Sequence, residues 1–220
     1  MQDDKVVLGI DTSGVKCSVA LWRQDIILFE KTVTAPNLHS TLLAGIVNES
    51  MNSTNMKVND IQLVCVTSGP GSFTGLRIGM SYAKGFCFAR ELPLIGVTNF
   101  EVLAQQGDVK TLPVYTLLDA RRGFYYMGIF KQNVHILDEY KMVKTVELHK
   151  EIADHGSVVC GEQDDGKELP LPPPISLPVI QAGIRIGIVC RLGYQKYLGG
   201  VQTKADSLEP LYIQPFAGIA

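Results

Sequence analysis

The stretch VVLGIDTSGVKCSVALW, Val6 to Trp22, decides the fold of this 220-residue chain. Its first five residues are apolar, as in a strand buried on both faces, and the run ends at Asp11. A few turn-forming residues follow, and then an alternating strand returns with Cys17, Val19 and Leu21 on one face. The stretch therefore predicts two neighbouring strands with an aspartate where the first one ends.

A second stretch, PVYTLLDARRGFYYMGIF from Pro113 to Phe130, repeats this pattern. The two aspartates, Asp11 and Asp119, lie 108 residues apart, which is close to half the chain. Superposed without a gap, the returning strands place Cys17, Val19 and Leu21 over Tyr125, Met127 and Ile129. Two unrelated hairpins would look alike, but similarity at this spacing favours a duplicated α/β unit. We expect two subdomains, at residues 1–107 and 108–220.

Apolar runs and helical periodicity predict the remaining elements. Further strands are expected at residues 26–32, 61–66, 94–97, 135–143 and 157–160. Helices are expected at residues 40–51, 74–90, 100–106, 146–153 and 182–198. The proline-rich segment 163–178 predicts a surface loop, and residues 209–220 an extended, docked tail.

The composition is that of a globular chain, with 46% hydrophobic and 19% charged residues. A net charge of −2 gives no bulk attraction for nucleic acid, so a partner would have to supply much of any such contact. Five cysteines stand singly in apolar runs, as expected of reduced thiols in a reducing compartment. No apolar stretch reaches the length of a membrane span, and the acidic start is unlike a secretory signal, so we expect a cytoplasmic protein without a membrane partner.

The glycine-rich stretch TSGPGSFTGLRIG, Thr67 to Gly79, raises the question of a phosphate site. It matches neither GxxxxGK[ST] nor GxGxxG. A helix that starts near Ser72 or Thr74 can bind an anion at its N-terminus, or the hydroxyl can cap the helix without a ligand. The cap is the favoured interpretation.

Small residues recur every four positions in the helix that follows, at Gly75, Gly79, Ala83 and Cys87. Each mid-helix glycine costs about 1 kcal/mol relative to alanine, so the stripe indicates a close approach by another backbone. Packing on the chain's own sheet and contact with a partner chain both explain it.

Catalytic and metal motifs are not found in the sequence. The histidines do not form an i, i+3 or i, i+4 pair, and neither a GxSxG elbow nor a cysteine–histidine signature occurs. Asp11 and Asp119 are expected at the carboxyl edge of a sheet, where a nucleotide's metal can bind, but aspartates there more often close their own turns.

Six segments together resemble the TsaB/YeaZ proteins, over essentially the whole chain. They are GIDTSGVKCSVAL, HSTLL, SGPGSFTGLRIGMSYAKGF, PLIGVTNFEVLA, LLDARRGFYYMGIF and LEPLYIQP. That family is the dimerisation subunit of the bacterial machinery that makes threonylcarbamoyladenosine beside the anticodon of tRNA. The resemblance implies an actin-like (ASKHA, ribonuclease H-like) duplicated α/β fold with an abbreviated second subdomain.

The resemblance also implies that the chain is not an enzyme on its own. The TsaD-type transferase carries an HxxxH metal motif after the strand that matches PLIGVT, and here Asn99 and Leu103 stand at those positions. No catalytic residue and no metal ligand are therefore expected.

A partner-binding role remains, and in the family the first two long helices form the association surface. The interface candidates are His39, Leu42, Leu43, Ile46, Leu76, Met80 and Ala83. Thr41 replaces the glutamate that usually follows HS in the family, which removes one charged contact.

The resemblance further implies remnants of a nucleotide loop. The candidates are Asp11, Thr12, Ser13, Ser68, Gly69, Gly71 and Asp119. The isolated chain is expected to bind no cofactor, with ATP or ADP only at an interface of the complex. Expected partners are a TsaD-type transferase, a TsaE-type ATPase, tRNA only through the complex, and a second copy when the chain is alone. The alternatives are a stand-alone ATP-binding phosphotransferase or a glycoprotease-like metallopeptidase.

Overall fold

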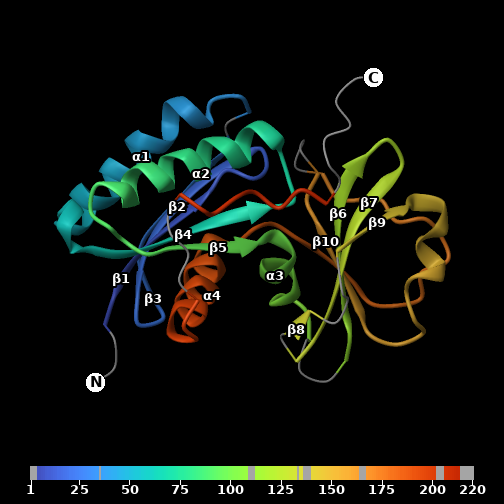
Figure 1. Ribbon diagram of the computed structural model, residues 1–220. Helices are drawn as coiled ribbons and strands as arrows, with labels where there is room; N and C mark the ends of the chain where they lie inside the picture. The colour runs from blue at the N-terminus through green and yellow to red at the C-terminus, as the bar shows by residue number, and fades with distance from the viewer. Residues whose placement is uncertain are drawn as a thin grey trace. The chain divides into compact units, whose positions relative to one another are not determined.

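A computed structural model of the chain describes residues 4–34, 36–108, 112–132, 134–135, 140–163, 167–201 and 206–213 (Figure 1). The described residues divide into two compact units. Unit 1 contains residues up to Thr98 together with Arg185–Pro210, and unit 2 contains Asn99–Ile184 and the residues from Leu211 onward. Each unit is built on its own sheet.

Sheet A of unit 1 has five strands in the order β3-β2-β1-β4-β5. Their bounds are β1 Val6–Asp11, β2 Lys16–Arg23, β3 Ile26–Thr34, β4 Ile61–Gly69 and β5 Leu94–Thr98. β1, β2 and β3 are antiparallel neighbours, whereas β4 runs parallel to β1 and β5 parallel to β4. All of β1 is buried, as its continuous apolar sequence predicts.

Helices cover both faces of sheet A. Two helices, α1 (His39–Thr54) and α2 (Phe73–Phe88), lie side by side on one face, and α4 (Ile186–Leu198) packs on the other (Figure 1). The first face is packed around Leu8, Ile10 and Val19, and a short 3-10 helix, Val58–Asp60, precedes β4. On the second face α4 fits closely, since a Cβ added at Gly193 would lie 2.2 Å from Cys65 Sγ.

Sheet B of unit 2 repeats the strand order of sheet A. Its strands are β6 Val114–Arg121, β7 Phe124–Lys131, β8 Val134–His135, β9 Lys141–Lys144, β10 Ser157–Gly161 and β11 Val179–Ala182. β6 pairs antiparallel with β7, which pairs antiparallel with β8 and β9, while β10 and β11 continue in parallel on the other side of β6. With β8 and β9 in the place of β3, the two sheets have the same topology, so the duplication is confirmed.

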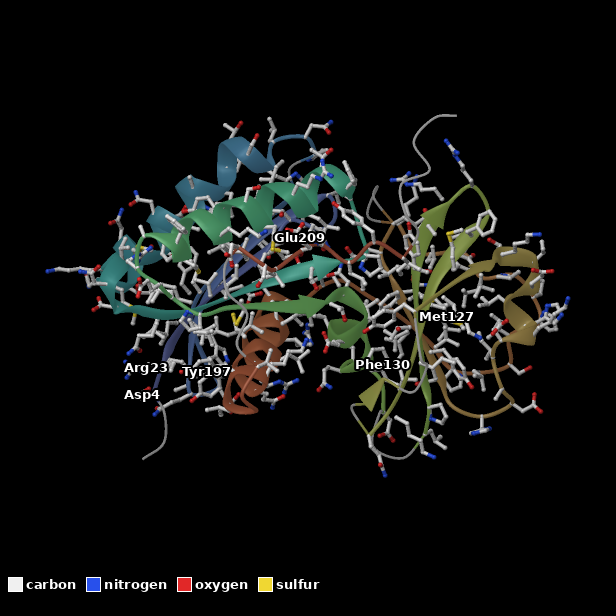
Figure 2. All side chains as sticks on the ribbon, viewed as in Figure 1. Asp4, Arg23, Met127, Phe130, Tyr197 and Glu209 are labelled. Atoms are coloured by element: carbon white, nitrogen blue, oxygen red, sulfur yellow. The ribbon has the colours of Figure 1, made fainter. Side chains whose placement is uncertain are left out.

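The cores of unit 2 lie on opposite faces of sheet B. Phe130 of β7 packs with α3 (Asn99–Ala104), and Met127 of the same strand packs on the other face (Figure 2). A 3-10 helix, Thr145–Lys150, lies beside β9 and contributes Leu148 to the second cluster. α3 is the one α-helix among the described residues of unit 2, which agrees with an abbreviated second subdomain.

Several details differ from the sequence-based expectations. The third strand of unit 2, expected at 135–143, is two segments, β8 and β9, with residues 136–139 outside the described ones. The segment 163–178 is more than a surface loop, because its described apolar residues Leu169, Leu171 and Leu177 pack on the core of unit 2. β11 was not predicted, and α4 starts at Ile186 rather than 182.

The unit boundaries also differ from the expected division at residues 107 and 108. α3 packs in unit 2, so the first boundary falls at Thr98, and α4 belongs to unit 1 because it covers sheet A. Leu208, just before the tail, packs in unit 1. Of the tail itself, Leu211 and Ile213 pack in unit 2, while residues 214–220 lie outside the described ones.

Among the described residues, no helix has both the length and the apolar character that crossing a bilayer requires.

Candidate functional site: a closed loop and an exposed helix pair

Asp11 is the last residue of β1, and its buried carboxylate accepts hydrogen bonds from two other residues of the chain. Its Oδ1 accepts hydrogen bonds from Ser13 N–H (2.9 Å), Ser13 Oγ–H (2.6 Å) and Thr67 Oγ1–H (2.7 Å). Burial raises the pKa of Asp11 above its ordinary value, because the charged form loses its water. The bonds from Ser13 and Thr67 and the nearby His39 act in the opposite direction. The carboxylate thus holds the β1–β2 turn and the end of β4 together.

The glycine-rich loop packs directly on that turn. Ser72 N–H donates to the Ser13 carbonyl oxygen (2.7 Å), and Thr12 Oγ1–H donates to the Gly75 carbonyl oxygen (2.7 Å). A Cβ added at Gly71 would lie 2.3 Å from the Ser13 carbonyl oxygen, and one at Gly75 would lie 2.0 Å from that of Thr12. These glycines are needed for contact between two segments of the same chain.

The start of α2 is capped by the chain itself. Ser72 Oγ accepts a hydrogen bond from Gly75 N–H at 3.2 Å, which satisfies one of the free amides at the helix N-terminus. Gly69 has φ +103°, a conformation that glycine adopts without strain, and the Gly69–Pro70 peptide bond is cis. The geometry thus agrees with the favoured interpretation of the glycine-rich loop, in which a hydroxyl caps the helix without a ligand.

The remaining nucleotide-loop candidates are also accounted for locally. Thr12, Ser13 and Ser68 are buried in unit 1. In unit 2, Asp119 Oδ1 accepts a hydrogen bond from Arg121 N–H at 2.8 Å, so it closes its own turn. Asp11 and Asp119 thus play similar local roles in their two hairpins.

The ladder registers refine the superposition of the two hairpins. Asp11 lies opposite Ser18, whereas Asp119 lies opposite Tyr125, so the second hairpin is one residue shorter. Tyr125 therefore corresponds in register to Ser18 and not to Cys17, as the ungapped superposition implies.

The positions that match the transferase's metal motif lie on α3. Asn99 begins this helix, and Leu103 is buried in the core that it forms with sheet B. Among the described residues, no three His, Cys, Asp or Glu side chains gather closely enough to hold a metal ion.

Six of the seven interface candidates face the interior of unit 1, which corrects their expected exposure. They are His39, Leu43, Ile46, Leu76, Met80 and Ala83. The apolar residues of an amphipathic helix cover the sheet below it, so their side chains are used inside the chain. His39 accordingly lies 3.2 Å from the Lys16 carbonyl oxygen through its Nε2, and only Leu42 is half-exposed.

The small-residue stripe of α2 also faces inward. A Cβ at Gly79 would lie 2.3 Å from Thr12 Oγ1, and Ala83 and Cys87 are fully buried. Of the two explanations left open by the sequence, packing on the chain's own strands is the one found.

Other residues form the outer surface of α1 and α2. On α1 they include Thr41, Gly45, Asn48 and Asn52, and on α2 Ser81, Gly85 and Phe88. Phe88 is 78% exposed. We call these seven residues the helix-pair face. The sequence signal that points to them is the helical spacing of uncharged residues on the side opposite the apolar stripe.

Gly45 and Gly85 differ from Gly75 and Gly79 in one respect. A Cβ added at either position would meet no heavy atom of the described chain within 4 Å. Both lie inside long helices, where glycine costs about 1 kcal/mol relative to alanine. Packing within the described chain therefore does not explain why glycine occupies either position.

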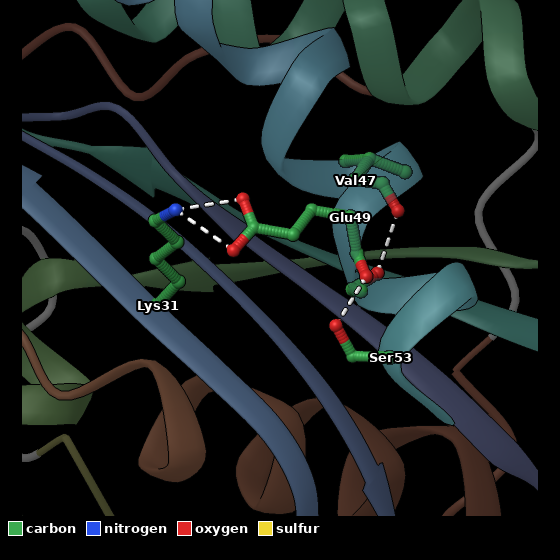
Figure 3. Close-up of polar contacts among 5 residues, drawn as sticks. Lys31, Val47, Glu49 and Ser53 are labelled. Atoms are coloured by element: carbon green, nitrogen blue, oxygen red, sulfur yellow. Dashed lines mark hydrogen bonds and ion pairs between the residues drawn. The ribbon is translucent and has the colours of Figure 1, made fainter. Parts of the chain in front are cut away.

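The charged side chains of the two helices are directed elsewhere. Glu49 is the one acidic residue of α1, and its carboxylate accepts hydrogen bonds from Lys31 Nζ of β3 at 2.8 and 2.6 Å (Figure 3). On α2, Lys84 forms an ion pair with Glu209 at 2.9 Å, and Arg77 lies over the Phe73 ring at 3.9 Å. The seven residues of the helix-pair face are uncharged, and the exposed Glu49 of α1 and Arg77 of α2 lie on the same two helices beside them.

Comparison with known proteins agrees with this topology. YeaZ from Pseudomonas aeruginosa superposes with a TM-score of 0.75 at 21% identity, over 94% of this chain and 99% of that one. The shared topology, repeated in sheets A and B, is the actin-like, duplicated α/β fold.

The family follows from sequence. The model of the family described as TsaD: tRNA N6-adenosine threonylcarbamoyltransferase matches residues 33–196. The tRNA threonylcarbamoyladenosine biosynthesis protein TsaB of Bacillus subtilis is 31% identical over 150 aligned residues, and the match covers 63% of this chain and 66% of that protein. TsaB of Escherichia coli is 34% identical over 134 aligned residues, and the match covers 58% of this chain and 55% of that protein.

This chain therefore belongs to the TsaD family and, within it, to the TsaB/YeaZ proteins. The matched segments span 55–66% of the length of these two curated relatives.

Proposed function

We propose that this chain is a non-catalytic scaffold in the biosynthesis of threonylcarbamoyladenosine in tRNA, and that it binds a TsaD-type transferase through the helix-pair face. The family supports the pathway, since both TsaB relatives are named for it. The surface is argued from this chain's own residues.

The observation that carries the proposal is the pair of exposed glycines, Gly45 and Gly85. Each lowers the stability of its helix, and neither has a neighbour within the described chain that excludes a Cβ. A helix of another chain that packs closely against α1 and α2 would explain why both positions hold glycine. Protein interfaces are depleted of charge at their centre and enriched in aromatic residues, which fits the uncharged surface and the exposed Phe88.

The same face serves a second copy of the chain when the transferase is absent. An uncharged face with a protruding aromatic ring favours association. Because the transferase belongs to the same family, one surface can accept either partner. The TsaE-type ATPase and any ATP or ADP belong to the assembled complex in this proposal.

The alternatives receive less support from the site. A phosphotransferase would need the Asp11 carboxylate for a nucleotide's metal, whereas Ser13 and Thr67 already bind its Oδ1. The metallopeptidase alternative requires a group of metal ligands, and none gathers in the described part of the chain. Calorimetric titration with MgATP tests the first alternative, and a metal assay tests the second.

Gly85→Leu tests the surface directly. The added side chain has open space in the isolated chain, so the variant folds, but it fills the space that the partner helix requires. Overpacking of this kind costs about 1–3 kcal/mol, so we expect the dissociation constant for the transferase to rise roughly 5- to 150-fold in biosensor titrations.

Ser53→Leu is the matched control, because it adds a similar side chain to the exposed flank of α1 near Glu49 (Figure 3). It should bind the transferase as the native chain does. Equal affinities for Gly85→Leu and the native chain would remove the helix-pair face from the interface.

A further inference from the structure

The helix-pair face is bordered on α1 by the charged side chain of Glu49. Residues three or four positions apart are neighbours on a helix surface, so Glu49 lies beside Gly45 and Asn52, which both belong to the face. Its carboxylate is nevertheless directed toward sheet A, because Lys31 Nζ of β3 donates to both carboxylate oxygens, at 2.8 and 2.6 Å (Figure 3). Lys31 itself is held by the sheet, where it lies opposite Val19 of β2. The charge of Glu49 is thus kept on the sheet side of α1.

Lys84 has the corresponding place on α2. It lies beside Ser81 and Phe88 of the helix-pair face, at the same helical spacings of three and four residues. Its Nζ donates to Glu209 Oε1 at 2.9 Å and to the Asp206 carbonyl oxygen at 3.2 Å. Both acceptors lie beyond α4 in the chain, so the ammonium group is drawn away from α2 toward the C-terminal segment.

The segment that carries these two acceptors is anchored in unit 1. Leu208 lies between Asp206 and Glu209 in the chain and packs in the same hydrophobic cluster as α1 and α2. A Cβ added at Gly96 of β5 would lie 2.8 Å from Leu208 Cδ1, so the leucine side chain fits closely. Packing explains Leu208 of the segment LEPLYIQP, but it does not explain Glu209, whose side chain is 73% exposed.

We propose that Lys31 and Glu209 are positioning residues for the partner, each of which withdraws one charge from the helix-pair face. The inference rests on the proposed function, which places a partner helix on Gly45 and Gly85. Interface centres are depleted of charged residues, because a desolvated and unpaired charge is costly, whereas the rim stays polar and solvent-accessible. With both ion pairs formed, the charges lie at the rim. With either pair broken, the freed side chain has residues of the face as its neighbours.

The stability of the isolated chain gives little reason for these ion pairs. The Lys31 and Glu49 side chains are 40% and 45% exposed, and ion pairs in contact with water add little to folding. A role in folding and a role in binding therefore predict different measurements. A pair that only fastens the helix changes the midpoint of urea denaturation when it is lost. A pair that positions a charge changes the affinity for the partner and leaves the midpoint nearly unchanged.

Glu209→Ala tests the pair on α2. It releases the Lys84 ammonium group, and we expect the dissociation constant for the transferase to rise by on the order of ten-fold in biosensor titrations. The same substitution is then made in a Lys84→Met background, where no charge is left to move. There Glu209→Ala should have no further effect on the affinity. A direct contact between Glu209 and the partner would instead give the same loss in both backgrounds.

Lys31→Ala tests the pair on α1 by the same cycle, with Glu49→Gln as the second background. We expect a rise on the order of ten-fold in the native background and none beside Glu49→Gln. Lys141→Ala and Glu151→Ala are the matched controls. They break an ion pair of 3.0 Å and similar exposure in unit 2, which contributes no residue to the helix-pair face. They remove the same two charges from the chain and should leave the affinity unchanged.

Light scattering of the native chain with the transferase separates this inference from the proposed function. If the complex forms but either variant binds with native affinity, or loses the same affinity in both backgrounds, the inference is overturned for that ion pair and the proposed function stands. If no complex forms, the proposed function fails, and the same cycles are measured on self-association of the chain by sedimentation. Self-association that the variants do not change, or a native chain that stays monomeric, then overturns the inference as well.

Discussion

Two glycines of α2 should respond to alanine substitution in opposite directions. At Gly85 an added Cβ meets open space, so alanine contributes helix propensity only. We expect Gly85→Ala to stabilise the isolated chain by about 0.5–1 kcal/mol, or about 1–4 °C in Tm for a chain of this size. At Gly79 the Cβ would lie 2.3 Å from Thr12 Oγ1, and we expect alanine to destabilise the chain by about 1–3 kcal/mol.

The second half of this prediction concerns binding. Gly85→Ala should stabilise the chain and yet weaken its association with the transferase, because the methyl group occupies space that a partner helix uses. Urea denaturation gives the stability, and biosensor titration gives the affinity. Gly79→Ala serves as the control, since it changes the interior and not the helix-pair face. If Gly85→Ala were both less stable and unchanged in binding, the argument from the exposed glycines would be refuted.

Three further predictions concern the interior of unit 1. Because burial raises the pKa of Asp11, its contribution to stability is present below pH 3.8 and is lost as the pH rises through the folded value. Asp11→Asn should therefore gain stability relative to the native chain between pH 4 and 7 in urea denaturation, and a relative loss would show that the charged form is favoured. Ser72→Ala removes the cap of α2 and should cost about 1 kcal/mol, whereas an unchanged Tm would mean that the cap contributes nothing. All five thiols are buried, and burial raises the pKa of Cys17 to about 11 and of Cys87 to about 12, so Ellman's reagent at pH 8 should react only after unfolding. Rapid labelling of the native chain would contradict their burial.

The architecture was predictable because the same strand pattern occurs twice in the sequence. Each copy has an apolar run that ends at an aspartate, and the side-chain period of two marks the returning strand. The same logic predicts the four strands β1, β2, β6 and β7, which the structure contains. β11 was missed because its four residues follow a proline-rich segment and offer too short a pattern. The place of α4 in unit 1 depends on contacts far along the chain, such as that of Gly9 with Cys190, which no local pattern reveals.

The surface was harder to predict than the core. The resemblance predicts Leu43, Ile46 and Met80 as interface residues because they lie on the first two long helices, but burying apolar side chains on the chain's own sheet is favourable in the isolated chain too. The glycines posed a related difficulty. Gly79 and Gly85 look alike in the sequence, and only the position of Thr12 beside one of them separates an internal contact from an exposed one.

Light scattering of the chain mixed with its TsaD-type transferase tests the central claim most directly. At micromolar concentration we predict one species whose mass is the sum of this 24.1 kDa chain and the transferase, or a simple multiple of that sum. Gly85→Leu should shift the mixture toward free components, and Ser53→Leu should not. Two separate species with the masses of the free proteins, obtained with the native chain, would contradict the account.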